Sequence, residues 1–350
     1  MSLEYLCRPS VPVPQVVRLP VLNVKELDVE IPNELKLVKG QPVVKKPFNL
    51  SDFVRKSMIL ISMVLVSNRV VLFFLGILNR LLGRPIRGIL LCYPAHEKYA
   101  HKYVFKWMFP IVKKKPMFAG FYFQSLKAGL TFVIYCHESQ FRSDADYLKH
   151  IGEQMSRLKF LTGVLEVNCT GILPTELHRA SLIPDDFFRY RCRTVGKVVV
   201  QAEKKVRQLN DLKPLPVIVL GGMGNVGREI CDLLKSEGRK VYSVEYGQKF
   251  PSTVRDHKAV LIDCSRKGVL ESRMEELWSG LILLNETFPE PKSQTVRQLK
   301  NMGIDSYHVT GAKAKAYPPF PYAYQGGIPC CGTLVGDNVE ALVKDLVVRK

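Results

Sequence analysis

The sequence predicts an α/β fold, and three observations support this. Short apolar runs, typical of strands buried on both faces, alternate with segments of helical periodicity. A glycine-rich turn follows the first run of the C-terminal half, and a helix pattern follows that turn. The runs of this half come at regular intervals, which predicts about five parallel strands. They occupy residues 217–220, 241–244, 259–263, 281–284 and 307–310.

The turn after residues 217–220 has the spacing G-x-G-x-x-G, which in this context predicts a dinucleotide-binding, Rossmann-type sheet. Its residues are Gly222, Met223, Gly224, Asn225, Val226 and Gly227. We expect Gly222 to allow the tight turn and Gly227 to let the helix lie close to the strand. Gly224 would let a pyrophosphate approach the free amides at the start of the helix.

The second strand of this half ends in Glu245, 23 positions after Gly222. A carboxylate at this point accepts hydrogen bonds from the ribose 2′-hydroxyl and repels a 2′-phosphate. The predicted cofactor is therefore NAD or NADP, with NAD favoured. Lys249 and Arg239 lie near enough in the sequence to keep NADP open.

The chain divides by composition into four parts. Residues 1–48 are rich in proline and predict an extended arm. Residues 49–87 predict an amphipathic apolar helix, and residues 88–184 a smaller N-terminal α/β substrate domain. Residues 185–350 predict the dinucleotide-binding domain, with a cleft between the two α/β domains and a final C-terminal helix. Within these parts we expect strands at 88–93, 130–136 and 159–167, and helices at 97–109, 145–158, 185–212 and 337–348.

The helix predicted over residues 49–83 is almost entirely apolar. Four polar or small residues, Arg55, Ser62, Arg69 and Gly76, recur every seven positions and would form one narrow stripe. A wide apolar face with basic ends favours a helix lying in the interface of an anionic membrane. A helix buried in the core or at a dimer interface, and a membrane-spanning helix, stay open as alternatives.

Charge and cysteine content limit the partners. The net charge is +19, and residues 1–120 hold 19 basic against 7 acidic side chains. This excess favours anionic lipid or an acidic carrier protein, whereas no nucleic-acid-binding module is present. Nine scattered cysteines without a C-x-x-C pair indicate reduced thiols in a cytoplasmic protein and no metal site. The expected location is cytoplasmic, with peripheral contact to the inner face of a membrane, and a homo-oligomer is open.

Two adjacent cysteines are the leading catalytic candidates. Cys330 and Cys331 lie in a glycine-flanked loop before the predicted last helix, and a helix N-terminus lowers a thiol pKa. Such a thiol could take an acyl group as a thioester for reduction by hydride. Lys197 and His137 are the alternatives for acid–base chemistry. The arginines at 189, 191 and 193 could bind a phosphate or carboxylate, or form an exposed basic turn.

The order of these parts resembles the long-chain acyl-(acyl-carrier-protein) reductases and, more remotely, shikimate-dehydrogenase-like proteins. The resemblance covers about residues 88–348. It rests on four stretches: the first α/β domain, residues 192–197 opening a helix into the nucleotide domain, the glycine turn, and a late cysteine before the C-terminal helix. It implies that Cys330 or Cys331 is the acyl-accepting nucleophile. Glu245 departs from the family, which uses NADPH, and residues 1–87 have no counterpart there.

The sequence thus favours an NAD(P)-dependent oxidoreductase acting on an acyl thioester, an aldehyde or a related carbonyl. Its substrate would be a small molecule or an acyl carrier, and a long apolar chain would suit the membrane-seeking helix. A hydroxy-acid or alcohol dehydrogenase without a covalent intermediate is the second hypothesis. A non-catalytic nucleotide-binding protein at a membrane surface is the third.

Overall fold

The computed structural model describes most of the chain from residue 53 onward. The described residues are 53, 56–57, 60–61, 64–94, 105–136, 138–320, 324, 326–334 and 339–347. The chain separates into residues 1–48 and residues 49–350, and every described residue belongs to the second unit. The proline-rich arm predicted for residues 1–48 lies outside the described residues.

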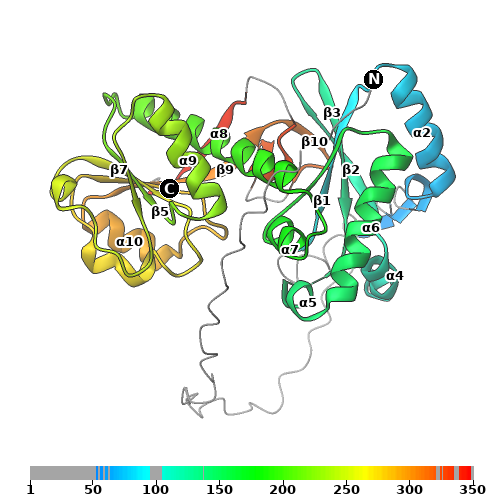
Figure 1. Cartoon of the computed structure of the whole chain (residues 1–350), viewed down its shortest axis with the longest axis horizontal. Helices are drawn as coiled ribbons and strands as arrows, with labels where there is room; N and C mark the ends of the chain where they lie inside the picture. Colours follow the sequence, from blue (N-terminus) through cyan, green and yellow to red (C-terminus); the bar gives the residue numbers. More distant parts are fainter. Residues whose placement is uncertain are drawn as a thin grey trace, which may run out of the picture. The chain divides into compact units, whose positions relative to one another are not determined.

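The C-terminal half forms a Rossmann-type sheet of seven strands, whose central strands are parallel as predicted (Figure 1). Their order is β11-β9-β8-β7-β5-β6, and β12 also pairs with β9. The direction of chain progression changes between β5 and β7, which makes this the topological switch point where ligands bind in such sheets. The strands are β5 (Val217–Leu220), β6 (Val241–Val244), β7 (Ala259–Asp263), β8 (Leu281–Asn285), β9 (Asp305–Lys313), β11 (Gly327–Ile328) and β12 (Ala341–Asp345).

Both faces of this sheet are covered, which explains its uninterrupted apolar strands. Val217 and Val219 pack with residues of α8 (Asp185–Leu209) and α9 (Asn225–Ser236). Ile218 and Leu220 point to the other face, where α10 (Ser293–Asn301) and the 3-10 turn η3 (Glu271–Glu276) contribute to the core. Alternate strand residues therefore enter two separate cores. A further 3-10 turn, η2, spans Ser252–Val254.

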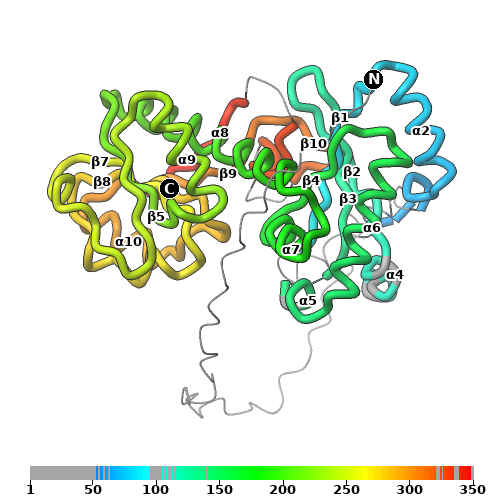
Figure 2. The backbone as a smooth tube through the Cα atoms, in the orientation of Figure 1, coloured from blue at the N-terminus to red at the C-terminus, as the bar shows by residue number. Residues whose placement is uncertain are grey.

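The first α/β sheet has the order β10-β2-β3-β1-β4. Strands β1, β3 and β4 are parallel, whereas β2 runs antiparallel to β3, and β10 antiparallel to β2. Figure 2 labels β4 of this sheet and β8 of the C-terminal sheet. One face carries α2 and α6, and the other packs against Ala312, Ala314, Ile328 and Leu334 of the C-terminal region. The elements are α2 (Arg69–Leu81), β1 (Ile86–Cys92), η1 (Lys106–Met108), α4 (Phe109–Lys114), β2 (Met117–Gln124), β3 (Lys127–Val133), α5 (Glu138–Ser143), α6 (Ala145–Thr162), β4 (Glu166–Cys169), α7 (Leu173–Arg179) and β10 (Lys315–Tyr317).

Several sequence predictions differ from the structure. The strand predicted at 159–167 is wrong, because α6 continues to Thr162 before β4 begins at Glu166. The last helix predicted at 337–348 is also wrong, because Ala341–Asp345 is a strand that pairs with β9. Strand β2 was not predicted, and the helix predicted at 97–109 falls mostly outside the described residues. Tertiary pairing outweighs local periodicity in such short apolar segments.

The helix predicted over residues 49–83 is not continuous. Residues 64–66 are helical, but a turn and bend at Ser67 and Asn68 follow, and Asn68 caps a new helix by accepting a hydrogen bond from the amide of Val70 at 2.9 Å. The predicted stripe of Arg55, Ser62, Arg69 and Gly76 therefore does not extend along one helix. Among the described residues, no helix is long and apolar enough to cross a membrane.

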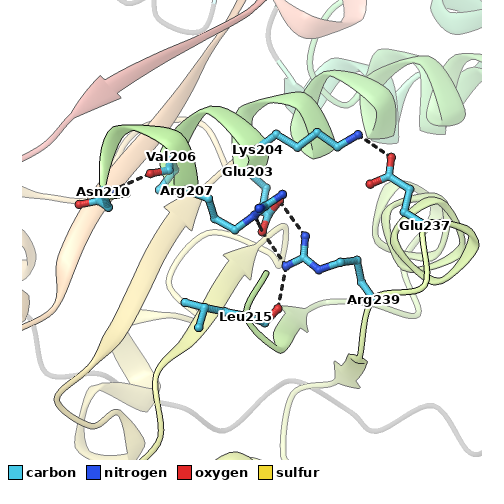
Figure 3. Close-up of polar contacts among 8 residues, drawn as sticks. All are labelled: Glu203, Lys204, Val206, Arg207, Asn210, Leu215, Glu237 and Arg239. Atoms are coloured by element: carbon cyan, nitrogen blue, oxygen red, sulfur yellow. Dashed lines mark hydrogen bonds and ion pairs between the residues drawn. The ribbon is translucent and has the colours of Figure 1, made fainter. Parts of the chain in front are cut away.

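Helix α8 is anchored to the C-terminal sheet by a buried carboxylate (Figure 3). The side chain of Glu203 is fully buried, and it accepts hydrogen bonds from Arg207 at 2.8 Å and from Arg239 at 2.9 Å. Arg239 also donates to the carbonyl of Leu215 at 2.7 Å, just before β5. Two guanidinium groups thus compensate one buried charge and fix α8 beside the amino ends of β5 and β6.

Candidate functional site

The turn between β5 and α9 has the geometry that the glycine spacing predicted, with one difference in detail. The left-handed backbone conformation lies at Gly221, with φ +82°, and not at Gly222. The amide of Gly221 donates to the carbonyl of Val244 at 2.8 Å, and its carbonyl accepts from Gly224 at 3.0 Å. Gly224 is the N-cap of α9 and has no side chain to occupy the free amides of the first helical turn.

The glycines of the fingerprint are required for different reasons. A β-carbon at Gly222 would lie 2.4 Å from the hydroxyl of Ser243, and one at Gly227 would lie 2.1 Å from the carbonyl oxygen of Gly221. Both positions are therefore closed by the protein's own packing. A β-carbon at Gly224 would meet a single atom within 4 Å, the Gly221 carbonyl oxygen at 3.1 Å. The outer side of Gly224 is thus open to a ligand.

Glu245 lies against this turn. It follows β6, and its carboxylate accepts a hydrogen bond from the amide of Met223 at 2.5 Å. Its own amide donates to the side chain of Gln248 at 2.9 Å. The structure therefore brings the predicted acid together with the glycine turn. Asn225 and Met223 are exposed, while Val226 is partly buried against the core of the sheet.

Arg273 holds the loop that carries Glu245, and the sequence analysis did not identify it. Its buried guanidinium donates to the carbonyls of Glu245, at 3.1 Å, and of Gln248. The same group pairs with Glu276 and lies over the ring of Phe250, 4.3 Å from its centroid. An arginine in a local 3-10 turn gives no sequence signal for a contact across 28 positions, so only the structure could reveal it.

Arg239 and Lys249, the two basic residues that left NADP possible as the cofactor, lie at different ends of β6. Arg239 precedes β6 and binds Glu203, so it lies at the end of the strand opposite Glu245. The four-residue strand between them is about 13 Å long. Arg239 is thus a structural residue and not part of the glycine-turn site. Lys249 follows Glu245 in the loop, where its charge helps to lower the pKa of Glu276 after the larger effect of Arg273.

Acidic side chains follow β7 and β8 at the same edge of the sheet. Asp263 is buried, and it accepts hydrogen bonds from the amide and the hydroxyl of Ser265 at 3.0 and 2.6 Å. The amide of Glu286 donates to the carbonyl of Asp263 at 2.8 Å. Burial, followed by the charge of Asp263, raises the pKa of Glu286 to about 8. A carboxyl group with a raised pKa at the edge where the carboxyl ends of parallel strands meet is a candidate for proton transfer.

Glu286 was missed at the sequence level, although a signal existed. It comes two residues after the apolar run 281–284, and Asp263 ends the run 259–263. The carboxyl ends of neighbouring parallel strands meet at one edge, so two acids there are expected to lie close together.

The predicted thiols lie in a different local structure from the one expected. Cys330 and Cys331 belong to the 3-10 turn η5 (Cys330–Gly332), and no α-helix begins in the described residues that follow. The helix N-terminus that was to lower their pKa is therefore not supported by the structure. Burial raises the pKa of Cys330 well above its ordinary value and that of Cys331 to about 11, with Arg191 opposing the shift of Cys331.

The η5 turn is held by the first sheet and by α8. Arg191 donates to the carbonyls of Cys331, at 2.8 Å, and of Thr333, at 3.0 Å, and it pairs with the buried Glu166 of β4 at 3.0 Å. The hydroxyl of Tyr122 donates to the carbonyl of Gly332 at 2.9 Å. Of the three arginines around Cys192, Arg191 is thus structural, while Arg189 and Arg193 are exposed.

Electrostatic coupling connects the glycine turn with the cysteine turn. Burial raises the pKa of Cys264, beside the glycine turn, and that of Cys330, and the charge of Glu286 adds to both shifts. The Cys264 thiol contacts the carbonyl of Leu220 at 3.3 Å. Cys330 and Cys331 in turn raise the pKa of Tyr324, together with burial. Glu286 therefore acts electrostatically on one thiol beside the predicted nucleotide turn and on one of the predicted nucleophiles.

The remaining candidates are not brought into this group by the contacts described. Lys197 is exposed on α8. His137 lies outside the described residues.

Comparison with known proteins gives only distant likenesses. No family model matches the sequence, and no curated protein matches it. The chain is similar to L-tryptophan dehydrogenase from Nostoc punctiforme, with 14% identity over 63% of this chain and 68% of that one and a TM-score of 0.31. It is also similar to the methylenetetrahydrofolate dehydrogenase-cyclohydrolase of Trypanosoma brucei, solved with NADP and an inhibitor, with 12% identity over 67% and 75% and a TM-score of 0.33. A fungal glyoxylate reductase, from Paecilomyes thermophila, shares 14% identity over 72% and 90%, with a TM-score of 0.25. Likenesses at this level carry no argument about activity.

Proposed function

We propose that this chain is an NAD(P)-dependent oxidoreductase acting on an acyl thioester, an aldehyde or a related carbonyl compound. The observation that carries the proposal is the open space beside Gly224. The protein's own packing closes Gly222 and Gly227 but leaves the outer side of Gly224 free, next to uncapped amides at the start of α9. Backbone of this form fits a pyrophosphate group.

The position of Glu245 supports NAD over NADP. Its carboxylate is already within hydrogen-bond distance of the turn, at the amide of Met223. A ribose seated there would offer its hydroxyls to the carboxylate, whereas a 2′-phosphate would meet a like charge. Arg239 is committed to Glu203, which leaves Lys249 as the candidate partner for a 2′-phosphate.

When bound, the nicotinamide ring supplies or accepts the hydride. In the leading mechanism the carboxylate of Glu286 accepts the thiol proton of Cys330 as its sulfur attacks the thioester carbonyl. The tetrahedral adduct then expels the carrier thiolate, which takes that proton back from Glu286, and the Cys330 thioester remains. After hydride reaches the carbonyl carbon, the aldehyde forms, Cys330 departs as thiolate, and it takes a proton delivered from solvent through Glu286. The raised thiol pKa makes such a base necessary.

A dehydrogenase without a covalent step is the second candidate, and the raised pKa of both thiols favours it. In that case Glu286, whose pKa is about 8, would exchange a proton directly with the carbonyl or hydroxyl oxygen of the substrate. Lys197 and His137 stay as the candidates from the sequence for this acid–base work, whereas Cys331 stays the alternative nucleophile of the covalent route.

The test uses the full chain, NADH, NADPH and a long-chain acyl-coenzyme A thioester. Calorimetry should show NADH binding more tightly than NADPH. Mass spectrometry of the protein incubated with the thioester alone should show an acyl adduct that Cys330→Ser removes, while Cys136→Ser, a buried thiol elsewhere, retains it.

Two results decide between the alternatives. Absence of the adduct, with NADH oxidised by an aldehyde in both variants, would support the dehydrogenase without a covalent step. Failure to bind either nucleotide would refute the proposed function altogether.

A further inference from the structure

Helix α2 packs against the protein through one leucine, one glycine and one asparagine. Its buried positions are Leu72, Gly76 and Asn79. A β-carbon at Gly76 would lie 1.9 Å from the carbonyl oxygen of Leu161, so the backbones of α2 and α6 are in direct contact there. Asn79 exchanges hydrogen bonds of 2.9 Å with the backbone of Ile86 and donates to the carbonyl of Thr162 at 3.1 Å. These contacts fix which face of the helix points outward.

The outward face of α2 is apolar. Phe74 is 64% exposed and Leu81 is 78% exposed, and Phe160 of α6 is exposed beside them, where Arg80 donates to its carbonyl. Contiguous exposed apolar surface of this kind marks an interaction site. We call this surface the outer face of α2; it consists of Val70, Phe74, Ile77, Leu78, Leu81 and Leu82.

The charges of the segment that carries the outer face have one sign. Between residues 53 and 96 the sequence contains no aspartate or glutamate, but it contains Arg55, Lys56, Arg69, Arg80, Arg84 and Arg87. Arg69 and Arg84 are exposed at the two ends of α2. An apolar strip flanked by cations is complementary to a surface that has an apolar interior below anionic groups.

From these observations we propose that the outer face of α2 docks on an anionic lipid bilayer. The helix has 13 residues and is about 20 Å long, so it lies in the interface and does not span the roughly 30 Å hydrocarbon core. Two copies of the chain joined through this face would bring the arginines of both copies together without a carboxylate from this segment to neutralise them. The charge pattern therefore favours lipid over a second copy.

The experiment is sedimentation of the full chain with vesicles that contain phosphatidylserine or only phosphatidylcholine. We expect binding to the anionic vesicles, which salt weakens but does not abolish. The triple variant F74Q/L78Q/L81Q should lose roughly 100-fold or more in vesicle affinity, because three apolar side chains no longer enter the bilayer. Arg69→Glu should lose roughly 30-fold, on the basis of about fivefold per charge.

Matched controls keep the result specific. Leu209→Gln removes an equally exposed leucine on α8, and Lys213→Glu reverses an exposed charge elsewhere; both should bind vesicles nearly as well as the wild type. All replaced side chains are exposed, and a circular-dichroism melt checks that each variant is folded.

Three outcomes would overturn the proposal. They are no binding of the wild type to anionic vesicles, equal binding of the triple variant, or a wild-type dimer without vesicle binding that the triple variant dissociates. The last would assign the outer face of α2 to a second copy.

Discussion

At the scale of single residues, the three glycines of the turn are needed for different reasons: two of them by the fold, and Gly224 by a bound ligand. Glycine at 222 and 227 is enforced by contacts of less than 2.5 Å that any β-carbon would make. At 224 the backbone has φ −66° and ψ 167°, which any residue can adopt, and the single close contact needs only a slight adjustment. The sequence shows all three as equal members of one motif, whereas their physical reasons differ.

We therefore predict that a substitution at Gly224 mainly weakens NADH binding, whereas one at Gly227 mainly lowers the free energy of unfolding. Gly224→Val should weaken NADH binding by at least about 100-fold, because its side chain would occupy the place of the pyrophosphate, and it should change the free energy of unfolding by less than about 1 kcal/mol. Gly227→Ala should lower that free energy by about 2 kcal/mol or more through overlap with Gly221. Calorimetry and urea unfolding measure the two quantities. Unchanged NADH affinity in Gly224→Val would remove the nucleotide site from this turn.

Glu286 makes a prediction about pH. Its folded-state pKa of about 8 lies above the ordinary value of 4.5, so the folded protein holds a proton that the unfolded chain releases in this window. Stability must then fall as pH rises from about 4.5 to 8, and become level above 8. We expect the wild type to lose about 2 kcal/mol over this range from Glu286, since the partly exposed group retains some water.

The measurement is urea unfolding of the wild type and Glu286→Gln at several pH values. The variant should have a flatter profile and gain relative stability at pH 8.5. A profile identical to the wild type would show that Glu286 titrates normally, which would also remove it as the acid–base group. Any smaller slope that persists is expected from Asp263, whose pKa is likewise raised by burial.

At the scale of elements, the end of a strand at which a residue lies determines which groups its side chain can contact. Arg239 and Glu245 lie six positions apart in the sequence, yet β6 places them at opposite edges of the sheet. Helix α8 then captures Arg239 through the buried Glu203. The sequence left Arg239 open as a partner of the 2′-phosphate, but in the structure Arg239 anchors α8.

Arg239→Met provides the test. Removing one partner of a buried pair leaves Glu203 less compensated, so we expect a loss of about 3 kcal/mol in the free energy of unfolding. The ratio of the dissociation constants for NADH and NADPH should stay the same, because the side chain is remote from Glu245. A changed ratio in a folded Arg239→Met protein would contradict the placement of Arg239. Lys249→Ala serves as the comparison at the correct end of the strand.

At the scale of the molecule, the C-terminal region contributes to both sheets. After β9 completes the parallel strands, β10 joins β2 in the first sheet, and the η5 turn returns to contact β1 and β4. Arg191 connects these parts, because it binds Glu166 of β4 and two carbonyls of the cysteine turn. The position of Cys330 and Cys331 therefore depends on packing between segments more than 100 residues apart.

We predict that Arg191→Met lowers the free energy of unfolding by about 3–5 kcal/mol, because Glu166 would keep a buried charge without a partner. The double variant Glu166→Gln with Arg191→Met should recover part of this loss. Urea unfolding of the two single variants and the double variant completes the cycle. Additive losses would show that the pair is not coupled.

Much of the nucleotide half could be predicted from the sequence. Residues 217–220, 241–244 and 259–263 were identified to the residue, and Glu245 was placed correctly at the end of its strand. The physical reason is that strands buried on both faces must be apolar throughout, and a close backbone approach requires glycine. Such constraints are local, so they remain visible without an alignment or a structure.

Only the tertiary structure decided the rest. Residues 337–348 have a helical pattern, yet residues 341–345 pair with β9 because a sheet edge was available. The apolar helix near residue 70 turns its glycine and asparagine inward because the backbone of α6 lies against it. Glu286 acquires its raised pKa from burial beside Asp263, 23 positions away. Each of these depends on contacts between distant segments, and the order of residues along the chain does not contain them.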